Sequence, residues 1–140
     1  MTTQVVFAEV TESQLDAAAL SAQVGHEAAG AGITFSGVVR NHDVGQAVDS
    51  IEYSSHPQAA AIIAQLAAET AVRDGVHGVG IAHRVGHLQV GDVALVAVVA
   101  AEHRSQGFGA VIDLVDEVKK RLPVWKKQHF TDGHTEWTGL

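Results

Sequence analysis

The segment 103–127, HRSQGFGAVIDLVDEVKKRLPVWKK, places the strongest constraint on the fold, because it combines a helix pattern with a helix stop. Its apolar residues recur at spacings of three and four, which predicts one buried helical face over residues 106–122. Those residues are Phe108, Val111, Ile112, Val115, Val118 and Leu122. Pro123 cannot continue a helix, so the helix is expected to end there. The rest of the fold is expected to be arranged around this helix.

Strand-like and helix-like runs alternate before this helix. The expected strands cover residues 4–10, 33–40, 48–54, 79–85 and 93–101, and the expected helices cover 15–29 and 59–73. Thr11 and Gln14 have capping-box spacing before the first helix. Turn-forming residues at 41–46 predict that 48–54 returns as the hairpin partner of 33–40. After Pro123, two short runs flank an Asp-Gly turn. The pattern indicates one α+β domain over residues 1–140, with three helices on a mostly antiparallel sheet.

Composition excludes several classes of function. The chain has no cysteine, which excludes disulfides, thiolate metal sites and a cysteine nucleophile, and means that any sulfur chemistry needs sulfur from another molecule. A formal net charge of −7 disfavours nucleic-acid binding, which requires a broad basic face. The first residues carry neither a basic segment nor a long apolar run, so we expect no signal peptide or membrane anchor and a cytoplasmic location.

Basic side chains are concentrated in one stretch of this acidic protein. Six of the nine Lys and Arg residues lie within 103–127, which allows a local anion site. Lys120 and Arg121 follow Asp116 and Glu117 by four residues and can pair with them on the solvent face of the helix. Lys119 instead lies beside the apolar stripe. There it either extends its amine to water or occupies a pocket as a base, nucleophile or anion clamp.

The lysines after the helix are separated by strand geometry. Successive side chains of an extended chain point to opposite sides, so only one of Lys126 and Lys127 can face the same site as Lys119. Alternation alone does not say which. Trp125, directly before Lys126, is interpreted as a core or interface anchor. A role as a stacking platform for a ring-shaped substrate is the less favoured interpretation.

Other candidate site residues follow strands. His103 and Arg104 lie between a buried strand and a helix N-terminus, which offers backbone donors for an anion. Arg40 ends another strand and is a similar candidate. His83 and His87 are four apart but fall in a strand and turn, without the helical context that directs two histidines at zinc, so no metal site is predicted. The sequence contains no P-loop, nucleophile elbow or dinucleotide-binding fingerprint.

Four motifs extend along nearly the whole chain. They are GAGITFSGVVRNHDVGQ at 30–46, HRVGHLQVGD at 83–92, AEHRSQGF at 101–108 and KKRLPVWKK at 119–127. In this order and combination they resemble the large (catalytic, MoaE-type) subunit of molybdopterin synthase. The resemblance implies that Lys119 and Lys126 are the catalytic pair and that Arg40, His103 and Arg104 line the substrate pocket. It also implies an α/β hammerhead-like domain with an additional small antiparallel β subdomain.

The resemblance further implies a reaction and its partners. Sulfur would pass to cyclic pyranopterin monophosphate, forming the dithiolene of molybdopterin. The donor would be a small ubiquitin-like subunit of the MoaD type, whose C-terminal Gly-Gly carries a thiocarboxylate. Two large subunits would form the central homodimer of a heterotetramer. No cofactor is expected, and a cysteine-free protein with a cationic pocket agrees with delivered sulfur and an anionic substrate.

Three departures from the family pattern stand out. Residues 54–56 read Ser-Ser-His after Tyr53, where the family usually has Glu-x-Tyr. Gly107 replaces an alanine in the helix, at a cost in helix propensity of about 1 kcal/mol. Gln128 replaces a glutamate beside the second lysine pair, so an acidic neighbour that could tune that lysine is absent.

Two alternative functions remain open from the residues alone. The first is a non-catalytic binding module that docks the tail of a ubiquitin-like partner in its basic site. The second is a lysine-dependent aldolase or lyase, which would form an imine with its substrate.

Overall fold

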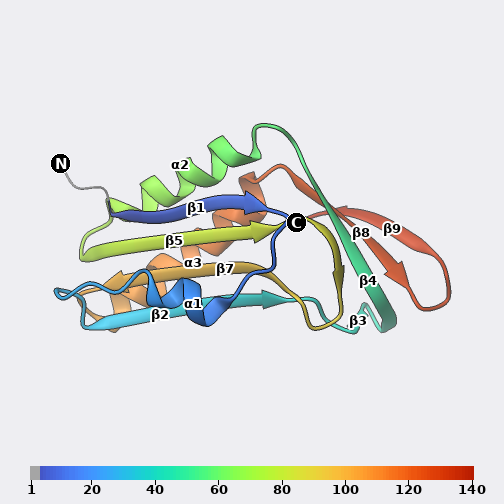
Figure 1. Ribbon diagram of the computed structural model, residues 1–140, viewed down its shortest axis with the longest axis horizontal. Helices are drawn as coiled ribbons and strands as arrows, with labels where there is room; N and C mark the ends of the chain where they lie inside the picture. Colours follow the sequence, from blue (N-terminus) through green and yellow to red (C-terminus); the bar gives the residue numbers. More distant parts are fainter. Residues whose placement is uncertain (1–3) are drawn as a thin grey trace.

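A four-stranded sheet forms the larger part of the molecule in the computed structural model, which describes residues 4–140 (Figure 1). Its strands, in spatial order, are β1 (Val5–Thr11), β5 (Val76–Arg84), β7 (Val93–Ala101) and β2 (Ala31–Val38). β1 pairs with β5 in parallel, and the other pairs are antiparallel. Helices α2 (Ala59–Ala71) and α3 (Arg104–Arg121) cover one face, and α1 (Ala17–Ala22) covers the other.

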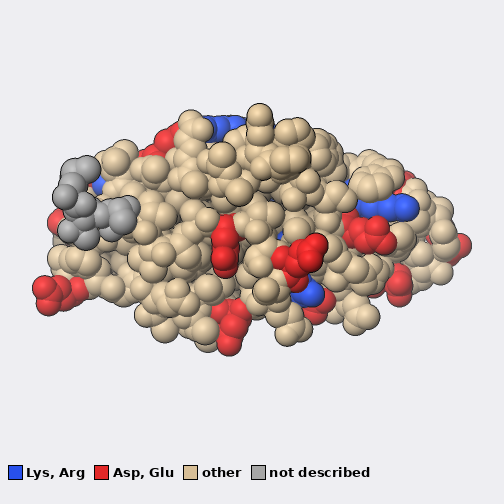
Figure 2. Space-filling view, turned by 45° about the horizontal axis from the view of Figure 1, so that its top comes forward, with Lys and Arg blue, Asp and Glu red and all other residues tan. Residues whose placement is uncertain are grey.

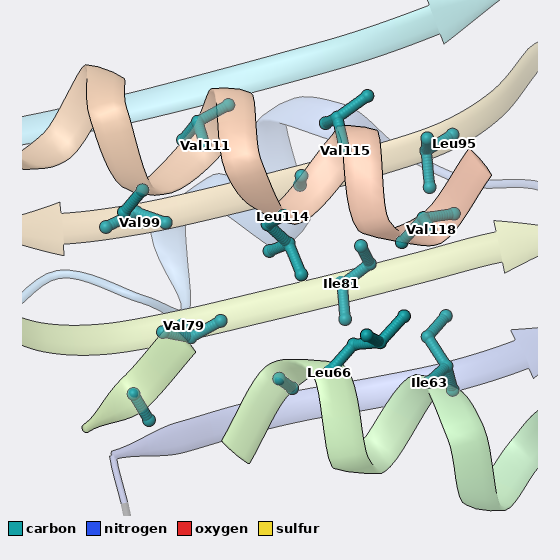
Figure 3. Packing of buried hydrophobic residues seen from close by; sticks show 14 of the residues in the cluster. Ile63, Leu66, Val79, Ile81, Leu95, Val99, Val111, Leu114, Val115 and Val118 are labelled. Atoms are coloured by element: carbon teal, nitrogen blue, oxygen red, sulfur yellow. The ribbon is translucent and has the colours of Figure 1, made fainter. Parts of the chain in front are cut away.

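The central strand β7 explains why the sheet is buried on both faces. Alternate residues Leu95, Ala97 and Val99 join the core under α2 and α3, whereas Val96 and Val98 join the cluster under α1. Figure 3 shows Leu114 and Val118 of α3 and Leu66 of α2 over Val79 and Ile81 of β5. Full burial of one such aliphatic side chain stabilises the fold by about 1.5–3 kcal/mol. The near-continuous apolar run 93–101 is therefore correctly predicted as a fully buried strand.

A second sheet lies beyond one end of the first (Figure 1). It is the smaller of the two in number of residues, although it has five strands. Its strands are β3 (His42–Asp43), β4 (Gln46–Ser55), β6 (Gly86–Gln89), β8 (Val124–Phe130) and β9 (Thr135–Gly139). β4 pairs with β3, β6 and β8, and β9 pairs with β8, all antiparallel. The α+β class and the additional antiparallel subdomain are both confirmed. Pro123 separates α3 from β8, as predicted.

Two of the predicted elements near the N-terminus are wrong in extent or pairing. The first helix covers only Ala17–Ala22, and its cap is Asp16, whose Oδ1 accepts a hydrogen bond from the Ala19 N–H at 3.1 Å. The predicted hairpin between 33–40 and 48–54 does not form, because β2 pairs with β7 in the larger sheet and β4 pairs in the smaller. The tight turn instead joins β3 to β4 through Val44 and Gly45, both with positive φ.

The buried face of α3 is also displaced from the predicted one. Phe108 and Ile112 are exposed, at 55% and 58%, while Gly107, Ala110 and Leu114 are buried. A Cβ atom on Gly107 would lie 2.9 Å from Cγ1 of Ile33 in β2. Gly107 therefore permits a close approach of helix and sheet, and this contact turns the small residues inward.

Acidic side chains are scattered over the face drawn in Figure 2, where basic ones are few, in agreement with the net charge. Among residues 4–140, no helix is both long enough and apolar enough to cross a bilayer.

Candidate active site

A cavity of about 290 Å³ lies where the two sheets meet the C-terminal end of α3. Three basic side chains line it, namely Arg40, Lys119 and Lys126. Its other polar side chains include Tyr53, His83 and Gln128. This volume is at the lower end of the range of about 300–1,000 Å³ that is typical of small-molecule sites. The cavity thus collects three of the five residues that the sequence singled out.

Lys119 reaches the cavity from the last turn of α3. Its neighbour Val118 is fully buried in the core, so the helix end is fixed and Lys119 projects from its margin. The structure combines the two positions left open by the sequence, because Lys119 borders the cavity and is also exposed to solvent. Within the described part of the chain Lys119 makes no salt bridge, whereas Arg121 binds Glu69 at 2.8 Å and Glu117 at 3.4 Å. Lys119 is therefore a free cation at the cavity edge.

Strand register brings Lys126 to the same cavity. Lys126 of β8 lies opposite Tyr53 of β4, and Gln128 lies opposite Ile51, so these side chains share the face that borders the cavity. Lys127 points to the other face, where its Nζ lies 5.6 Å from the ring centroid of Trp137. The structure thus resolves the choice between the two lysines that alternation left open.

The surroundings of Lys126 increase the fraction of its neutral amine. Partial burial lowers the pKa of Lys126, and the positive charges of Lys119 and Arg40 lower it further, against the opposing effect of Asp43. A lower pKa increases the fraction of free amine, which is the form that accepts a proton or attacks an electrophile.

Arg40 supplies the third cation from the end of β2. Its guanidinium lies 3.5 Å from the Asp43 carboxylate, and its side chain is 67% exposed. Arg40, Lys119 and Lys126 thus bring three positive charges to the cavity, beside the carboxylate of Asp43. Three cations in one cavity suit a phosphate or a carboxylate, to which the exposed Arg40 guanidinium can donate paired hydrogen bonds.

His83 and Tyr53 form a buried part of the cavity wall that sequence reasoning did not assign to the site. Their rings meet edge to face, with centroids 5.1 Å apart. Burial lowers the pKa of His83 to about 4 and raises the pKa of Tyr53. The sequence alone suggests His83 only as a possible metal ligand together with His87. The position of His83 at the end of β5, beside Arg84, is the signal that could have indicated a site residue.

His103 and Arg104 lie at the opposite end of α3 from Lys119. The backbone N–H of His103 donates to Oε1 of Gln106 at 3.2 Å, which stabilises the helix start. From Arg104 to Lys119 the helix rises roughly 22 Å, at about 1.5 Å per residue. Both residues are exposed and neither borders the cavity of its own chain.

Among residues 4–140, no three His, Asp or Glu side chains gather closely enough to hold a metal ion. The site is defined instead by amines, a guanidinium and neutral acceptors around a cavity.

Comparison with known proteins identifies relatives of this sequence and fold. The family model described as MoaE protein matches residues 10–121. The molybdopterin synthase catalytic subunit of Nostoc sp. is 35% identical over 133 residues, which cover 94% of this chain and 81% of that protein. That of Halalkalibacterium halodurans is 36% identical over 118 residues, 84% of this chain and 75% of that one. The crystal structure of molybdopterin synthase from Staphylococcus aureus superposes with a TM-score of 0.84 at 29% identity, covering 96% of this chain and 97% of that chain.

The fold and the sequence matches thus define a protein of the class that contains these catalytic subunits. The chain belongs to the MoaE family.

Proposed function

We propose that this chain is the catalytic subunit of a molybdopterin synthase, a sulfurtransferase of molybdenum cofactor biosynthesis. It would transfer sulfur from the C-terminal thiocarboxylate of a small, ubiquitin-like MoaD-type subunit to cyclic pyranopterin monophosphate. The product is the dithiolene of molybdopterin. The observation that carries the proposal is the cavity in which Arg40, Lys119 and Lys126 meet, in a chain of this family that has no sulfur nucleophile of its own.

The cavity offers two kinds of chemistry. Arg40 and Lys119 are cations that suit the substrate phosphate and the carboxyl-derived tail of the donor subunit. Lys126 has a lowered pKa and so supplies a free amine for an acid-base or nucleophilic step. Because the neighbouring cations contribute to that lowering, an anion bound between them would raise the pKa of Lys126 again.

The separation of His103 and Arg104 from the cavity supports an oligomeric arrangement. The family resemblance implies that this pair lines the substrate pocket, yet within one chain α3 holds it roughly 22 Å from Lys119 along the helix axis. A second large subunit could bring its own His103 and Arg104 to the cavity of the first. We therefore include a central homodimer, with one small subunit at each end, in the proposed cytoplasmic assembly.

The test is dithiolene formation by the purified chain with a thiocarboxylated small subunit and the pterin substrate. Lys119→Ala should lose about 100-fold or more of the rate, as expected for a positioned acid-base or anion-binding group. Lys120→Ala is the matched control, since Lys120 is the next residue on the solvent side, and it should keep the rate. Undiminished product formation by Lys119→Ala would overturn the assignment. Partner binding without any turnover by the unaltered chain would favour a binding module.

A further inference from the structure

His83 is the buried polar group of the cavity that the proposed reaction leaves unused. It lies at the end of β5 with 2% of its surface exposed and borders the cavity together with Lys119. Val10 of β1 and Leu95 of β7 flank it in register, so both neighbouring strands present apolar side chains. Buried polar groups are normally hydrogen-bonded, so the role of this imidazole depends on its protonation state and on its hydrogen-bond partner.

The hydrogen bond of His83 fixes its tautomer. Nδ1 lies 2.8 Å from the backbone carbonyl oxygen of Arg84. A carbonyl oxygen only accepts, so Nδ1 must carry the proton and donate it. In a neutral ring the other nitrogen, Nε2, then has a free lone pair. Nε2 has no hydrogen-bond partner among residues 4–140.

The charges around His83 keep the ring neutral. Burial is the main cause that lowers the pKa of His83 to about 4, and the Lys119 charge adds to it, against the hydrogen bond to the Arg84 carbonyl. The titratable side chains that border the cavity from the other elements are Tyr53 of β4, Lys126 of β8, His42 of β3 and Arg40 after β2, and the last residue, Leu140, also lines it. None of these four side chains is an anion at neutral pH that would favour an imidazolium.

An unpartnered acceptor and an unpartnered donor therefore line the same cavity. Lys119 has three donor hydrogens and makes no salt bridge within the described residues, while Nε2 of His83 can only accept. In the structure, no hydrogen bond joins exposed Lys119 to Nε2 of His83, although both residues border the cavity. We infer that His83 is a positioning residue: when an anion in the cavity draws Lys119 inward, Nε2 accepts a hydrogen bond from the Lys119 ammonium and aims it at the bound substrate. The inference rests on the proposed function for its catalytic consequence, but the hydrogen bond itself does not depend on turnover.

Two substitutions of His83 separate the loss of the hydrogen-bond acceptor from the loss of side-chain volume. They test whether His83 contributes to catalysis. His83→Phe keeps an aromatic ring without the acceptor, and should lower kcat about 10- to 100-fold, as for a lost hydrogen bond to a charged group, with little change in KM. His83→Gln restores an acceptor oxygen near the position of Nε2 and should recover much of kcat. His87→Phe, on the exposed face of the small sheet, is the matched control and should keep both constants. Equal losses in His83→Phe and His83→Gln would contradict the inference.

A double-mutant cycle distinguishes positioning of Lys119 from an independent role. In a Lys119→Ala background, His83→Phe should cause little further loss, because the donor is already absent. Multiplicative losses would overturn the inference, as they would show that His83 acts without Lys119.

An activity-independent measurement keeps the inference testable if the proposed reaction fails or a variant does not fold. Long-range proton–nitrogen NMR of the unaltered protein should show His83 as the Nδ1–H tautomer. Inorganic phosphate as the probe should move Lys119 and change the Nε2 shift, and Lys119→Ala should abolish that response. An Nε2–H tautomer, or the same phosphate response in Lys119→Ala, would refute the hydrogen bond. Absence of dithiolene formation with these signals intact would reject only the proposed function.

Discussion

Lys126 and Lys127 are neighbours in β8, yet the two faces of this strand give them opposite surroundings. Lys126 faces the cavity, where burial and two other cations lower its pKa. Lys127 faces outward and lies over the ring of Trp137. The comparison shows that strand alternation, and not the local density of charge, decides which of two adjacent lysines has a chemical role.

The two faces also differ in how their polar groups are satisfied. On the outward face, Glu52 lies 3.1 Å from Nε2 of His129 and 3.8 Å from Nδ1 of His87. On the cavity face, Lys119 has no such partner among residues 4–140, and Oε1 of Gln128 is buried without a hydrogen bond. Partners on the outward face are already present, whereas the cavity face leaves polar groups that a bound ligand or water can satisfy.

The largest expected difference between the faces is catalytic. Lys126→Ala should reduce the rate of dithiolene formation about 100-fold or more, because it removes the amine with the lowered pKa. Lys127→Ala should stay within about twofold of the unaltered protein, since an exposed pair of this kind contributes little. Rates measured with a thiocarboxylated small subunit provide the comparison. Equal losses of rate in Lys126→Ala and Lys127→Ala would contradict the proposed difference between the two faces of β8.

The next effect concerns stability in acid. His83 has a pKa of about 4 in the folded protein and about 6.5 when unfolded, so below pH 6.5 the unfolded chain binds more protons. The neutral His83 side chain therefore contributes to the free energy of unfolding in full above pH 6.5. This contribution, on the order of 3 kcal/mol, is lost as the pH falls toward 4. His83→Phe should flatten this part of the pH dependence of urea unfolding.

The same substitution on the outward face is the control for this pH dependence. His129→Phe should retain the loss of stability between pH 6.5 and 4, because His83 is still present. If His83→Phe still lost the full amount of stability between pH 6.5 and 4, another group would be the cause of the pH dependence.

A smaller effect is expected on anion binding. Arg40→Ala should weaken the binding of inorganic pyrophosphate about tenfold, as for one charge-assisted hydrogen bond. Arg73→Ala is the control, since Arg73 binds Asp113 at 2.6 Å, away from the cavity. Calorimetry at two salt concentrations measures both, and higher salt should weaken the binding. Unchanged affinity in Arg40→Ala would remove Arg40 from the anion site.

The smallest expected effect is structural and lies on the outward face. Trp137→Ala removes the ring below Lys127 and should lower the free energy of unfolding by about 0.5–1 kcal/mol. The dithiolene rate should not change. A large loss of activity with normal stability would assign the outward face a function that its contacts do not indicate.

The sequence predicted the elements that carry strong local signals. The buried strand 93–101, the helix ended by Pro123 and the hairpin at Asp132-Gly133 all form. The pairing of β4 with β8 could not be predicted from such local signals, because it joins residues 69 to 82 positions apart and its register depends on tertiary contacts. This register is what selects Lys126 over Lys127.

The exposed apolar residues of α3 show a second limit. Periodicity placed Phe108 and Ile112 on the buried face, but the close approach at Gly107 turns smaller side chains inward. Among the candidate site residues, Arg40, Lys119 and Lys126 converge, since each adjoins a fixed element end or strand face. His103 and Arg104 do not, because a helix separates residues in proportion to its length.

Transfer of labelled sulfur in a single turnover is the most direct test of the central claim. The small subunit would carry a radiolabelled thiocarboxylate, and the label would be followed after mixing with this chain and cyclic pyranopterin monophosphate. The account predicts that the label leaves the small subunit and appears in the pterin with the unaltered chain and with Lys127→Ala, but not with Lys126→Ala. Label that remains on the small subunit while both ligands are bound to the unaltered chain would contradict it.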